Sequence, residues 1–461
     1  MSDSNLKLAV LVDNPLRDLN GVMLLAGKLA DLGCDVFIVE MYNQLYDISM
    51  IVPDVVIVNY CRANNVEYLK YYKSLGASII VLDTEGSWTE DLSRSVNDAA
   101  KYAKMADVDY YFFWGNKQKN AFEATGLLDK GKLFVTGCPR HDFCMNNSHP
   151  SPLSDTGTPP NYILINTRYP RSNPRFTRGD RDEIKGMVNA GFSLVAARQY
   201  LKDDYTSRDI FLDALSVIIN DFPKQFFIIR PHPFENDRIY QEFSKSFTNV
   251  RVVREGTSID MISKASLLIH QNCTTSIEAN LLNKPCISLE WFNTDNLLSP
   301  IARDTSENAW SIDQLARYIR NVISGSVEVK VSSLVYDYFN YDVSSEGAAA
   351  RISNIIDNER HKLKSKGIVV HTSSSLSLGV RLKLKFVRIF GYGLFRTLRM
   401  VFRYYSHVKS LNKEIDGNCM FQILDTLRQR SFISNNVRLQ NCTFPRGSGK
   451  IFLLRNHNGI G

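Results

Sequence analysis

The sequence contains no CxxC pair, no GxGxxG stretch and no apolar run near the roughly 20 residues that a membrane span needs. Its eight cysteines are scattered, several in strand-like segments, so we expect reduced, mostly buried thiols and a cytoplasmic protein. The start, MSDSNLK, leads straight into an apolar segment and predicts no signal peptide. These absences argue against a disulfide scaffold, an integral membrane protein and the usual dinucleotide fingerprint.

Acidic residues are missing from one long segment. Residues 361–413 hold 12 Lys or Arg and no Asp or Glu, whereas the rest of the chain has 43 basic and 48 acidic residues, a net charge of −5. The overall charge of +7 therefore comes from this segment, and an anionic partner should meet the chain there. We expect that partner to be a membrane surface and not nucleic acid.

Alternating apolar strands and amphipathic helices predict an α/β protein. Residues 6–40 read as strand, helix and strand, and further strands are expected at 55–59, 77–82, 110–114 and 132–135. Segment 146–161 has linker composition, and a second α/β unit begins at 162. The prediction is two Rossmann-like domains, 1–145 and 161–360, joined by a linker at 146–160 and followed by a basic helical extension, 361–461. A helix at 344–359 is expected to close the second domain.

Polar residues follow an apolar strand in the stretch FFIIRPHPFEN. Arg230 and His232 alternate with Pro231 and Pro233 at the end of this strand. The carboxyl ends of strands are where ligands bind in an open parallel sheet. An arginine and an imidazole stiffened by prolines suit a phosphate oxygen, and His232 could donate a proton as a nucleotide phosphate leaves. The alternative is a plain structural turn.

The stretch HQNCTTSIEA combines a strand end with a helix start. Thr274, Thr275 and Ser276 offer hydroxyls to a phosphate, and Glu278 could reach a ribose hydroxyl. The alternative is a capping box, since Thr275 and Glu278 have the required spacing.

An acidic turn, LDTEGSW, ends a strand of the first domain. Glu85, or second to it Asp83, could take a proton from a sugar hydroxyl that attacks an anomeric carbon, or steady positive charge on the sugar. A solvated or helix-capping turn is the alternative. A basic loop, 168–181, begins with Arg168 and is expected either to be solvated or to clamp an anionic donor or acceptor.

The segment from Val380 can be drawn as one basic amphipathic helix. Its basic residues share one face and its apolar residues largely the other, so residues 380–409 are expected to lie on an anionic membrane surface or, alternatively, to pack on the catalytic domains. Gly391 and Gly393 disfavour an unbroken helix. Residues 414–461 predict little, and their end is expected to be loosely ordered.

FFWGNKQ (112–118), VTGCPRHDF (135–143), IIRPHPFEN (228–236) and HQNCTTSIEANLLNKPCISLEW (270–291) together resemble the bacterial surface carbohydrate biosynthesis proteins, a GT-B-like group. The resemblance covers residues 6–359. It implies a glycosyltransferase that binds its acceptor mostly on the first domain and a nucleotide sugar mostly on the second.

The same set is similar to bacterial sialyltransferases and Kdo transferases, which use CMP-linked sugars. This similarity implies a catalytic carboxylate at Glu85 and a CMP phosphate held by His232, Pro233, Thr274, Thr275 and Ser276. Thr84 stands where those families often have an acid. No convincing DxD pair is present, so we expect metal-independent transfer to a surface polysaccharide or lipid-linked acceptor, with no cofactor, at the inner face of the plasma membrane.

Two other readings keep the same fold. A CDP-alditol phosphotransferase or a UDP-sugar epimerase-like enzyme would also place basic and hydroxyl residues against phosphate. A non-catalytic GT-B scaffold would recruit partners through its basic tail.

Overall fold

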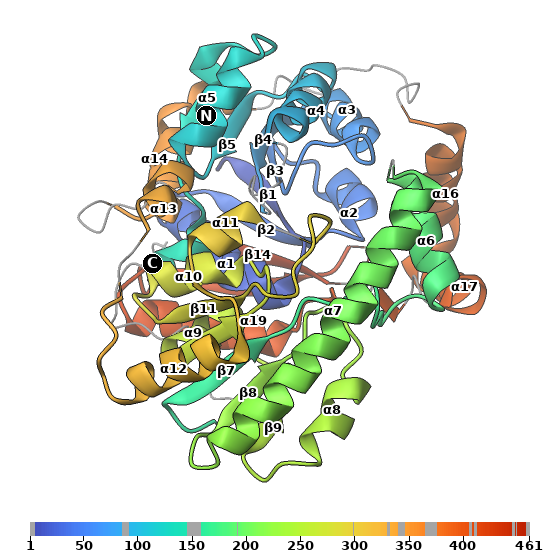
Figure 1. Cartoon of the computed structure of the whole chain (residues 1–461). Helices are drawn as coiled ribbons and strands as arrows, with labels where there is room; N and C mark the ends of the chain where they lie inside the picture. Colours follow the sequence, from blue (N-terminus) through green and yellow to red (C-terminus); the bar gives the residue numbers. More distant parts are fainter. Residues whose placement is uncertain are drawn as a thin grey trace. The chain divides into compact units, whose positions relative to one another are not determined.

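The computed structural model describes residues 5–84, 92–144, 158–190, 192–297, 299–329, 332–339, 346–364, 376–404, 408–409, 413–444, 448 and 450–457. The chain forms two compact units, Met1–Asn146 with Tyr336–Gly461, and Asn147–Val335. Each has a parallel-rich sheet with helices packed against it (Figure 1). The predicted class, two Rossmann-like α/β domains, is confirmed at this level.

The first unit begins with regular alternation of strands and helices. The elements are β1 (Lys7–Val12), α1 (Pro15–Asp31), β2 (Asp35–Glu40), α2 (Gln44–Ile51), β3 (Val55–Val58), α3 (Val66–Ser74), β4 (Ser78–Leu82), α4 (Leu92–Met105), β5 (Tyr110–Phe113), α5 (Asn116–Ala124), η1 (Lys130–Lys132), β6 (Leu133–Val135) and η2 (Pro139–Cys144). All six strands predicted here are present. They are almost wholly apolar because helices cover both faces of the sheet.

The C-terminal part of the chain completes this unit. It contains α14 (Ala348–Asn358), α15 (Arg360–Leu363), α16 (Leu378–Phe390), α17 (Tyr392–Phe402), α19 (Gly417–Gln429), β13 (Val437–Cys442) and β14 (Ile451–Asn456), after α13 (Ser333–Tyr338) at the boundary between the units. The sheet order is β13-β14-β2-β1-β3-β4-β5-β6, with β14 antiparallel to β2. The expectation of a loose end was therefore wrong for β14.

Two more sequence predictions need correction. The helix expected to close the second domain, α14, belongs to the first unit, where Asp142 accepts hydrogen bonds from the backbone N–H groups of Ala348 (2.7 Å) and Ala349 (2.9 Å). The single basic helix from Val380 is two helices, because Gly391 has φ 83° and ends α16. Leu384 and Val387 of α16 are buried in the core of the first unit.

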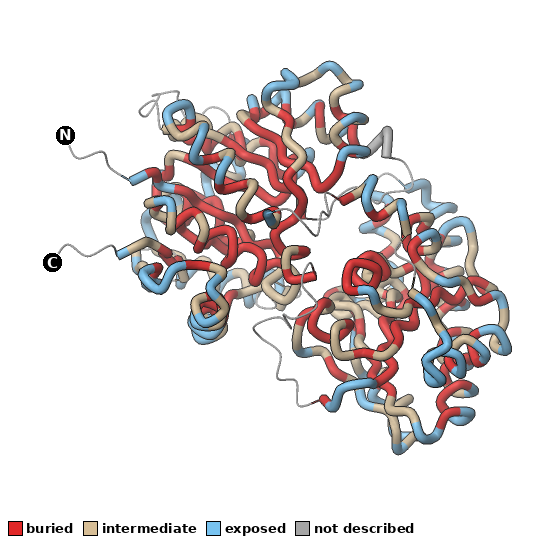
Figure 2. Tube along the Cα trace, turned by 90° about the vertical axis from the view of Figure 1, so that its left-hand side faces the viewer, coloured by how far each residue is buried: buried red, intermediate tan, exposed pale blue. Residues whose placement is uncertain are grey.

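The second unit is the shorter one. Its elements are β7 (Tyr162–Asn166), α6 (Asp180–Asn189), α7 (Leu194–Asp221), β8 (Phe227–Arg230), α8 (Arg238–Ser244), β9 (Val250–Val252), α9 (Ser258–Lys264), β10 (Ala265–His270), α10 (Thr275–Leu281), β11 (Cys286–Leu289), α11 (Pro300–Asp304), β12 (Glu307–Ala309) and α12 (Ile312–Ile323). Its six strands are all parallel, in the order β12-β11-β10-β7-β8-β9. Figure 2 shows buried strands inside each unit and exposed outer surfaces on the helices.

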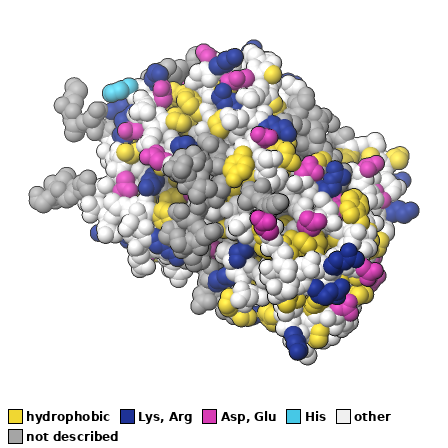
Figure 3. All heavy atoms as spheres, turned by 60° about the vertical axis from the view of Figure 1, so that its left-hand side comes forward, with side chains coloured by type: hydrophobic (Ala, Val, Ile, Leu, Met, Phe, Trp, Pro, Cys, Tyr) yellow, Lys and Arg dark blue, Asp and Glu magenta, His cyan; other side chains and the backbone are white. Residues whose placement is uncertain are grey.

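The surface carries mixed charge on the face that Figure 3 shows, where basic and acidic side chains are interspersed. In the part of the chain that the structure describes, no helix is long and apolar enough to cross a membrane. The same residues include no group of three or more His, Cys, Asp or Glu placed to hold a metal ion.

Candidate functional site

Strand order marks one edge of the second sheet as the candidate position for a ligand. Numbered from β7, the order is 3-2-1-4-5-6, whose direction reverses between β7 and β10. Asn166 ends β7 and is in register with Arg230 on one side and His270 on the other. Its Nδ2 donates to Thr275 Oγ1 (2.9 Å), whereas its buried Oδ1 has no hydrogen-bond partner among the described residues. A ligand bound at this edge could satisfy the unpaired buried oxygen.

Arginines converge at the same edge. Arg230 donates from Nη2 to the Gly256 carbonyl (3.3 Å), but its buried Nε has no acceptor within the described ranges, and neither has the buried Nη1 of Arg175. Burial lowers the pKa of Arg230, which the Glu278 carboxylate opposes and the charge of Arg254 reinforces. Burial and Arg254 also lower the pKa of Arg175. Arg254 pairs with Asp237 (2.5 Å), so its own charge is partly neutralised, whereas the N–H groups of Arg230 and Arg175 that lack acceptors among the described residues favour a nearby anion.

The turn after β8 fixes the orientation of His232. The backbone N–H of His232 donates to Thr167 Oγ1 (3.2 Å), and the N–H of Phe234 donates to His232 Nδ1 (3.2 Å). With Nδ1 as acceptor, a neutral ring carries its proton on Nε2. His232 and Pro233 are half-buried, and they form a turn directly after β8.

Glu235, which the sequence analysis overlooked, anchors this turn. It is fully buried and accepts from the backbone N–H of Tyr169 (2.7 Å), from the Thr167 hydroxyl (3.0 Å) and from the Tyr240 hydroxyl. Burial raises the pKa of Glu235 to about 7, although these donors oppose the shift. Glu235 therefore supports the His232 turn from beneath.

The three hydroxyls after β10 have different environments. Thr274, and not Thr275, is the N-cap of α10 and its side chain makes no capping bond, so the alternative of a capping box formed by Thr275 and Glu278 does not describe the start of this helix. The Thr275 hydroxyl donates to Cys273 Sγ (3.1 Å) while accepting from Asn166. Ser276 is fully buried and bonds to Thr305 Oγ1 (2.8 Å), and Glu278 is also buried. Ser276 thus supports the turn from inside, and Thr274 and Thr275 lie at its surface.

His270 in this turn is structural. It is fully buried, its Nδ1 accepts from the backbone N–H of Cys273 (3.2 Å), and its Nε2 lies 2.9 Å from Ser306 Oγ. Burial, together with the nearby Arg168, lowers the pKa of His270 to about 3. The ring is therefore neutral at physiological pH.

The arginine loop after β7 is tied to the second unit. Arg168 donates to the Leu297 carbonyl (2.8 Å), and Arg171 pairs with Glu183 (2.7 Å). The backbone N–H of Arg175 donates to the carbonyl of Phe234 (3.0 Å), which joins this loop to the His232 turn. Of the loop arginines, Arg175 rather than Arg168 presents an unused buried N–H.

In the first unit, the acidic turn is described only in part. Glu85 and Gly86 lie outside the described residues, whereas Asp83 follows β4 and its carbonyl accepts from Trp114 Nε1 (2.6 Å). Thr84 is held on three sides: its N–H donates to the Asn59 carbonyl (2.9 Å), its Oγ1 accepts from Arg17 (3.2 Å) and its carbonyl accepts from Arg140 (3.3 Å). The backbone is thus fixed immediately before Glu85.

Asp13 forms a second feature that the sequence analysis missed. It follows β1, where the strand order of the first unit reverses between β1 and β3, and it pairs with Arg17 (2.9 Å) and Lys413 (2.5 Å). Burial favours its neutral form, but Lys413 and Arg17 outweigh burial and lower the pKa of Asp13. Asp13 is therefore an ionised anchor and a weak base.

One sequence signal would have found both Asp13 and Arg254. Each is a charged residue directly after an apolar strand, in LAVLVD and VRVVRE, the same rule that singled out Asp83 and Arg230. Glu235 carries no such signal because it lies within a loop.

Comparison with known proteins finds no matching family model and no matching curated protein. Among solved structures, Methanocaldococcus jannaschii UDP-GlcNAc 2-epimerase in complex with UDP-GlcNAc and UDP is 13% identical, with 77% of this chain and 100% of that chain covered and a TM-score of 0.47. S. aureus MnaA with UDP is 12% identical, covering 78% and 98%, with a TM-score of 0.48. The wall teichoic acid polymerase TagF is 10% identical, covering 78% and 91%, with a TM-score of 0.49. Similarity at this level defines neither a family nor a reaction for this chain.

Proposed function

We propose that this protein is a glycosyltransferase that takes a sugar from a nucleotide-activated donor and adds it to a surface polysaccharide or a lipid-linked acceptor. The nucleotide phosphate binds at the carboxyl edge of the second sheet. The donor class that the sequence resemblance favours is a CMP-linked acidic sugar, and the transfer needs no metal.

The observation that carries the proposal is the convergence of Arg175, Arg230 and Arg254 beyond the strands of a six-stranded Rossmann-ordered sheet. Buried N–H groups of Arg175 and Arg230 lack acceptors in the described part of the chain. A phosphate would supply oxygens to both and relieve the repulsion between the guanidinium groups. Asn166 and Thr275 border the same position and can contact the donor from the β10 side.

In the proposed reaction, the acceptor hydroxyl oxygen attacks the anomeric carbon while the bond from that carbon to the phosphate oxygen breaks. Glu85, with Asp83 as the alternative, takes the proton of the attacking hydroxyl. Because His232 Nδ1 accepts from the N–H of Phe234, the neutral ring carries its proton on Nε2, and His232 can donate that proton to the departing nucleotide. Thr274, with Pro233 shaping the turn, completes the phosphate site, and Glu278 is proposed to act through its charge on Arg230.

The test is transfer and donor hydrolysis by the full chain with a panel of CMP-, CDP-, UDP- and GDP-activated donors, in EDTA. We expect sugar transfer with release of the nucleotide, and a loss of about 10²- to 10⁴-fold in Glu85→Gln and His232→Asn, as expected for general acid–base residues. Epimerised donor without acceptor, or transfer of an alditol phosphate with release of CMP, would replace the glycosyltransferase assignment. The absence of both binding and turnover with every donor in the panel would refute the assignment.

A matched control is Arg251→Ala. Arg251 lies on β9 next to the site but is exposed and in register with Ile228 of β8. Its substitution should leave donor binding and turnover unchanged, whereas a loss equal to that in the site variants would indicate a general effect of removing charge from this unit.

A further inference from the structure

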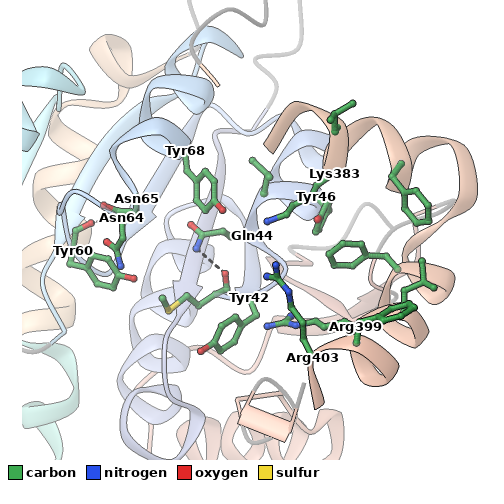
Figure 4. Close-up of a pocket in the computed structure, with 17 residues that line it drawn as sticks. Tyr42, Gln44, Tyr46, Tyr60, Asn64, Asn65, Tyr68, Lys383, Arg399 and Arg403 are labelled. Atoms are coloured by element: carbon green, nitrogen blue, oxygen red, sulfur yellow. Dashed lines mark hydrogen bonds between the residues drawn. The ribbon is translucent and has the colours of Figure 1, made fainter. Parts of the chain in front are cut away.

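The first unit contains a cavity of about 600 Å³, distinct from the anion site of the second unit (Figure 4). Its walls come from the segment after β2, from α2, from the loop between β3 and α3, from α3, and from α16 and α17. The volume falls within the roughly 300–1,000 Å³ typical of small-molecule sites. The cavity is therefore large enough for a substantial part of a lipid-sized ligand.

The lining is apolar and aromatic with basic groups on one side. Of the 17 lining residues, seven are Leu, Phe or Met, four are Tyr, three are Asn or Gln, and three are basic. None of these described lining residues is acidic. In Figure 4, Lys383, Arg399 and Arg403 extend from the α16–α17 side, and Tyr60, Asn64 and Asn65 lie across from them. Such a lining suits a molecule that is both hydrophobic and anionic.

The break between α16 and α17 creates this cavity. Leu384 and Val387 anchor α16 in the core, Phe395 of α17 packs on Tyr46 of α2 (ring centroids 5.5 Å apart), and the chain turns at Gly391. Two other apolar residues of α17, Leu398 and Phe402, line the cavity. They stay partly accessible to solvent, since Leu398 is 37% exposed and Phe402 is 78% exposed. The apolar wall therefore continues onto the protein surface.

The exposed surface beside the opening is also apolar. Leu382 of α16, which also lines the cavity, is 57% exposed, and Phe390, whose ring packs on the lining Phe386 (centroids 4.9 Å apart), is 58% exposed. Val401 of α17 is 63% exposed. Exposed apolar residues interleaved with Lys and Arg are typical of helices that lie at an anionic lipid surface. A hydrocarbon chain could thus enter without crossing a polar barrier.

Tyr42, which lines the cavity, also contacts Lys413, the ion-pair partner of Asp13. Arg399 lies over the Tyr42 ring (5.2 Å), and Lys413 lies over the same ring (5.6 Å) while pairing with Asp13. Tyr42 therefore separates the cavity from the charged residues beyond β1. A head group held by the arginines would face that side.

We propose that the cavity binds the hydrocarbon chain of a single-chain lipid phosphate, with the phosphate held by Arg399, Arg403 and Lys383. The binding itself is independent of the proposed glycosyl transfer; the assignment of this lipid as the acceptor rests on it. Charge complementarity and the continuous apolar wall favour this occupant over a free sugar or an inorganic anion.

The test is binding of n-alkyl phosphates to the full-length protein below their micelle concentrations, measured by calorimetry. Each methylene removed between dodecyl and octyl phosphate should weaken binding about fourfold, which corresponds to about 0.8 kcal/mol per buried methylene. Dodecanol should bind at least tenfold more weakly than dodecyl phosphate, and inorganic phosphate should not compete. Affinity independent of chain length, or full competition by inorganic phosphate, would overturn the proposal.

Paired variants localise the binding. Leu398→Trp should fill the cavity and weaken dodecyl phosphate binding more than tenfold, whereas Leu378→Trp, on an exposed and non-lining position of α16, should not. Arg403→Gln should weaken the phosphate but not dodecanol, with Lys385→Gln as the non-lining control. Equal effects in each pair, or binding only to phosphatidylglycerol vesicles unaffected by Leu398→Trp, would place the lipid on the surface and not in the cavity.

The two proposals fail separately. Sugar transfer to a soluble acceptor without alkyl phosphate binding would refute the lipid site alone. Chain-length-dependent binding without nucleotide-sugar turnover would leave the lipid site in place and refute the transferase.

Discussion

Arg230→Met is expected to weaken nucleotide binding without destabilising the protein. The side chain has a buried Nε without an acceptor among the described residues, and its bond to the Gly256 carbonyl is long, at 3.3 Å. An unsatisfied buried donor costs about 1–3 kcal/mol, and the Gly256 bond contributes about 1 kcal/mol or less. Methionine removes both, but it also removes the favourable charge interaction of Arg230 with the buried Glu278, so the free energy of unfolding of the ligand-free protein should change by little.

The effect on binding has the opposite sign. A hydrogen bond to a charged group contributes about 1.5–3 kcal/mol, so losing Arg230 should raise the Kd of the nucleotide by about 10- to 150-fold. Calorimetric titration with CMP, CDP and UDP would measure the Kd, and urea unfolding without ligand would measure stability. The variant should also lose the ligand-induced rise in Tm.

A loss of stability without a change in the Kd would contradict a role for Arg230 in nucleotide binding. If Arg230→Met lost more than about 2 kcal/mol of stability while the Kd stayed the same, Arg230 would be a structural residue. Arg251→Met, exposed on β9, is the control that should leave both quantities unchanged.

Three further predictions concern the first unit. Burial raises the pKa of Asp47 to about 7, so the folded state binds more protons than the unfolded state between about pH 4 and 7, and the free energy of unfolding should fall as pH rises through this window. Asp47→Asn should reduce the slope seen in urea unfolding at pH 5 to 8, and the buried Glu40, whose pKa is also raised to about 7, should account for part of the slope that remains. An unchanged slope would contradict this. Leu454→Ala, at a fully buried position of β14, should cost about 2–5 kcal/mol in the same assay, and a loss no greater than that of the exposed Gln440→Ala on β13 would mean that β14 adds little to the core. Asp142→Ala should cost about 0.5–2 kcal/mol and speed amide exchange at Ala348 and Ala349, whereas exchange rates matching those of the native protein would show that Asp142 does not hold α14.

Local patterns were sufficient to predict the strands β1 to β11, but not β12, β13 or β14. The near-continuous apolar strands, such as VVIV and SIIVL, identify positions buried on both faces, and the helices between them set a parallel order. The same patterns placed Arg230, His232 and Thr274 after strands of one sheet, because strand ends are local features. The sequence could not distinguish the buried Ser276 hydroxyl from the hydroxyls of Thr274 and Thr275, because Ser276 is buried against Thr305, which lies 29 positions further along the chain.

Distant pairing is what the sequence does not reveal. The helix α14 is amphipathic, but its apolar face does not specify which sheet it covers, and it packs in the first unit. The strand β14 resembles many short apolar segments, and its pairing of Leu453 with Phe37 joins residues more than 400 positions apart. The composition of residues 361–413 shows that this segment is basic and lacks acidic residues. It does not show that α16 contributes buried residues to the core of the first unit.

This integration changes how the C-terminal basic segment can be tested. A scaffold model predicts that deleting residues 380–409 abolishes recruitment, but that deletion would also remove Leu384 and Val387 from the core and the walls of the cavity. It would shorten the connection to Lys413, which pairs with Asp13, and to β14. Loss of function after the deletion would therefore not distinguish recruitment, lipid binding and unfolding. Substitutions at the exposed Phe390 and Val401 leave the buried anchors in place, so they test attachment to a surface, and Leu398→Trp tests the cavity.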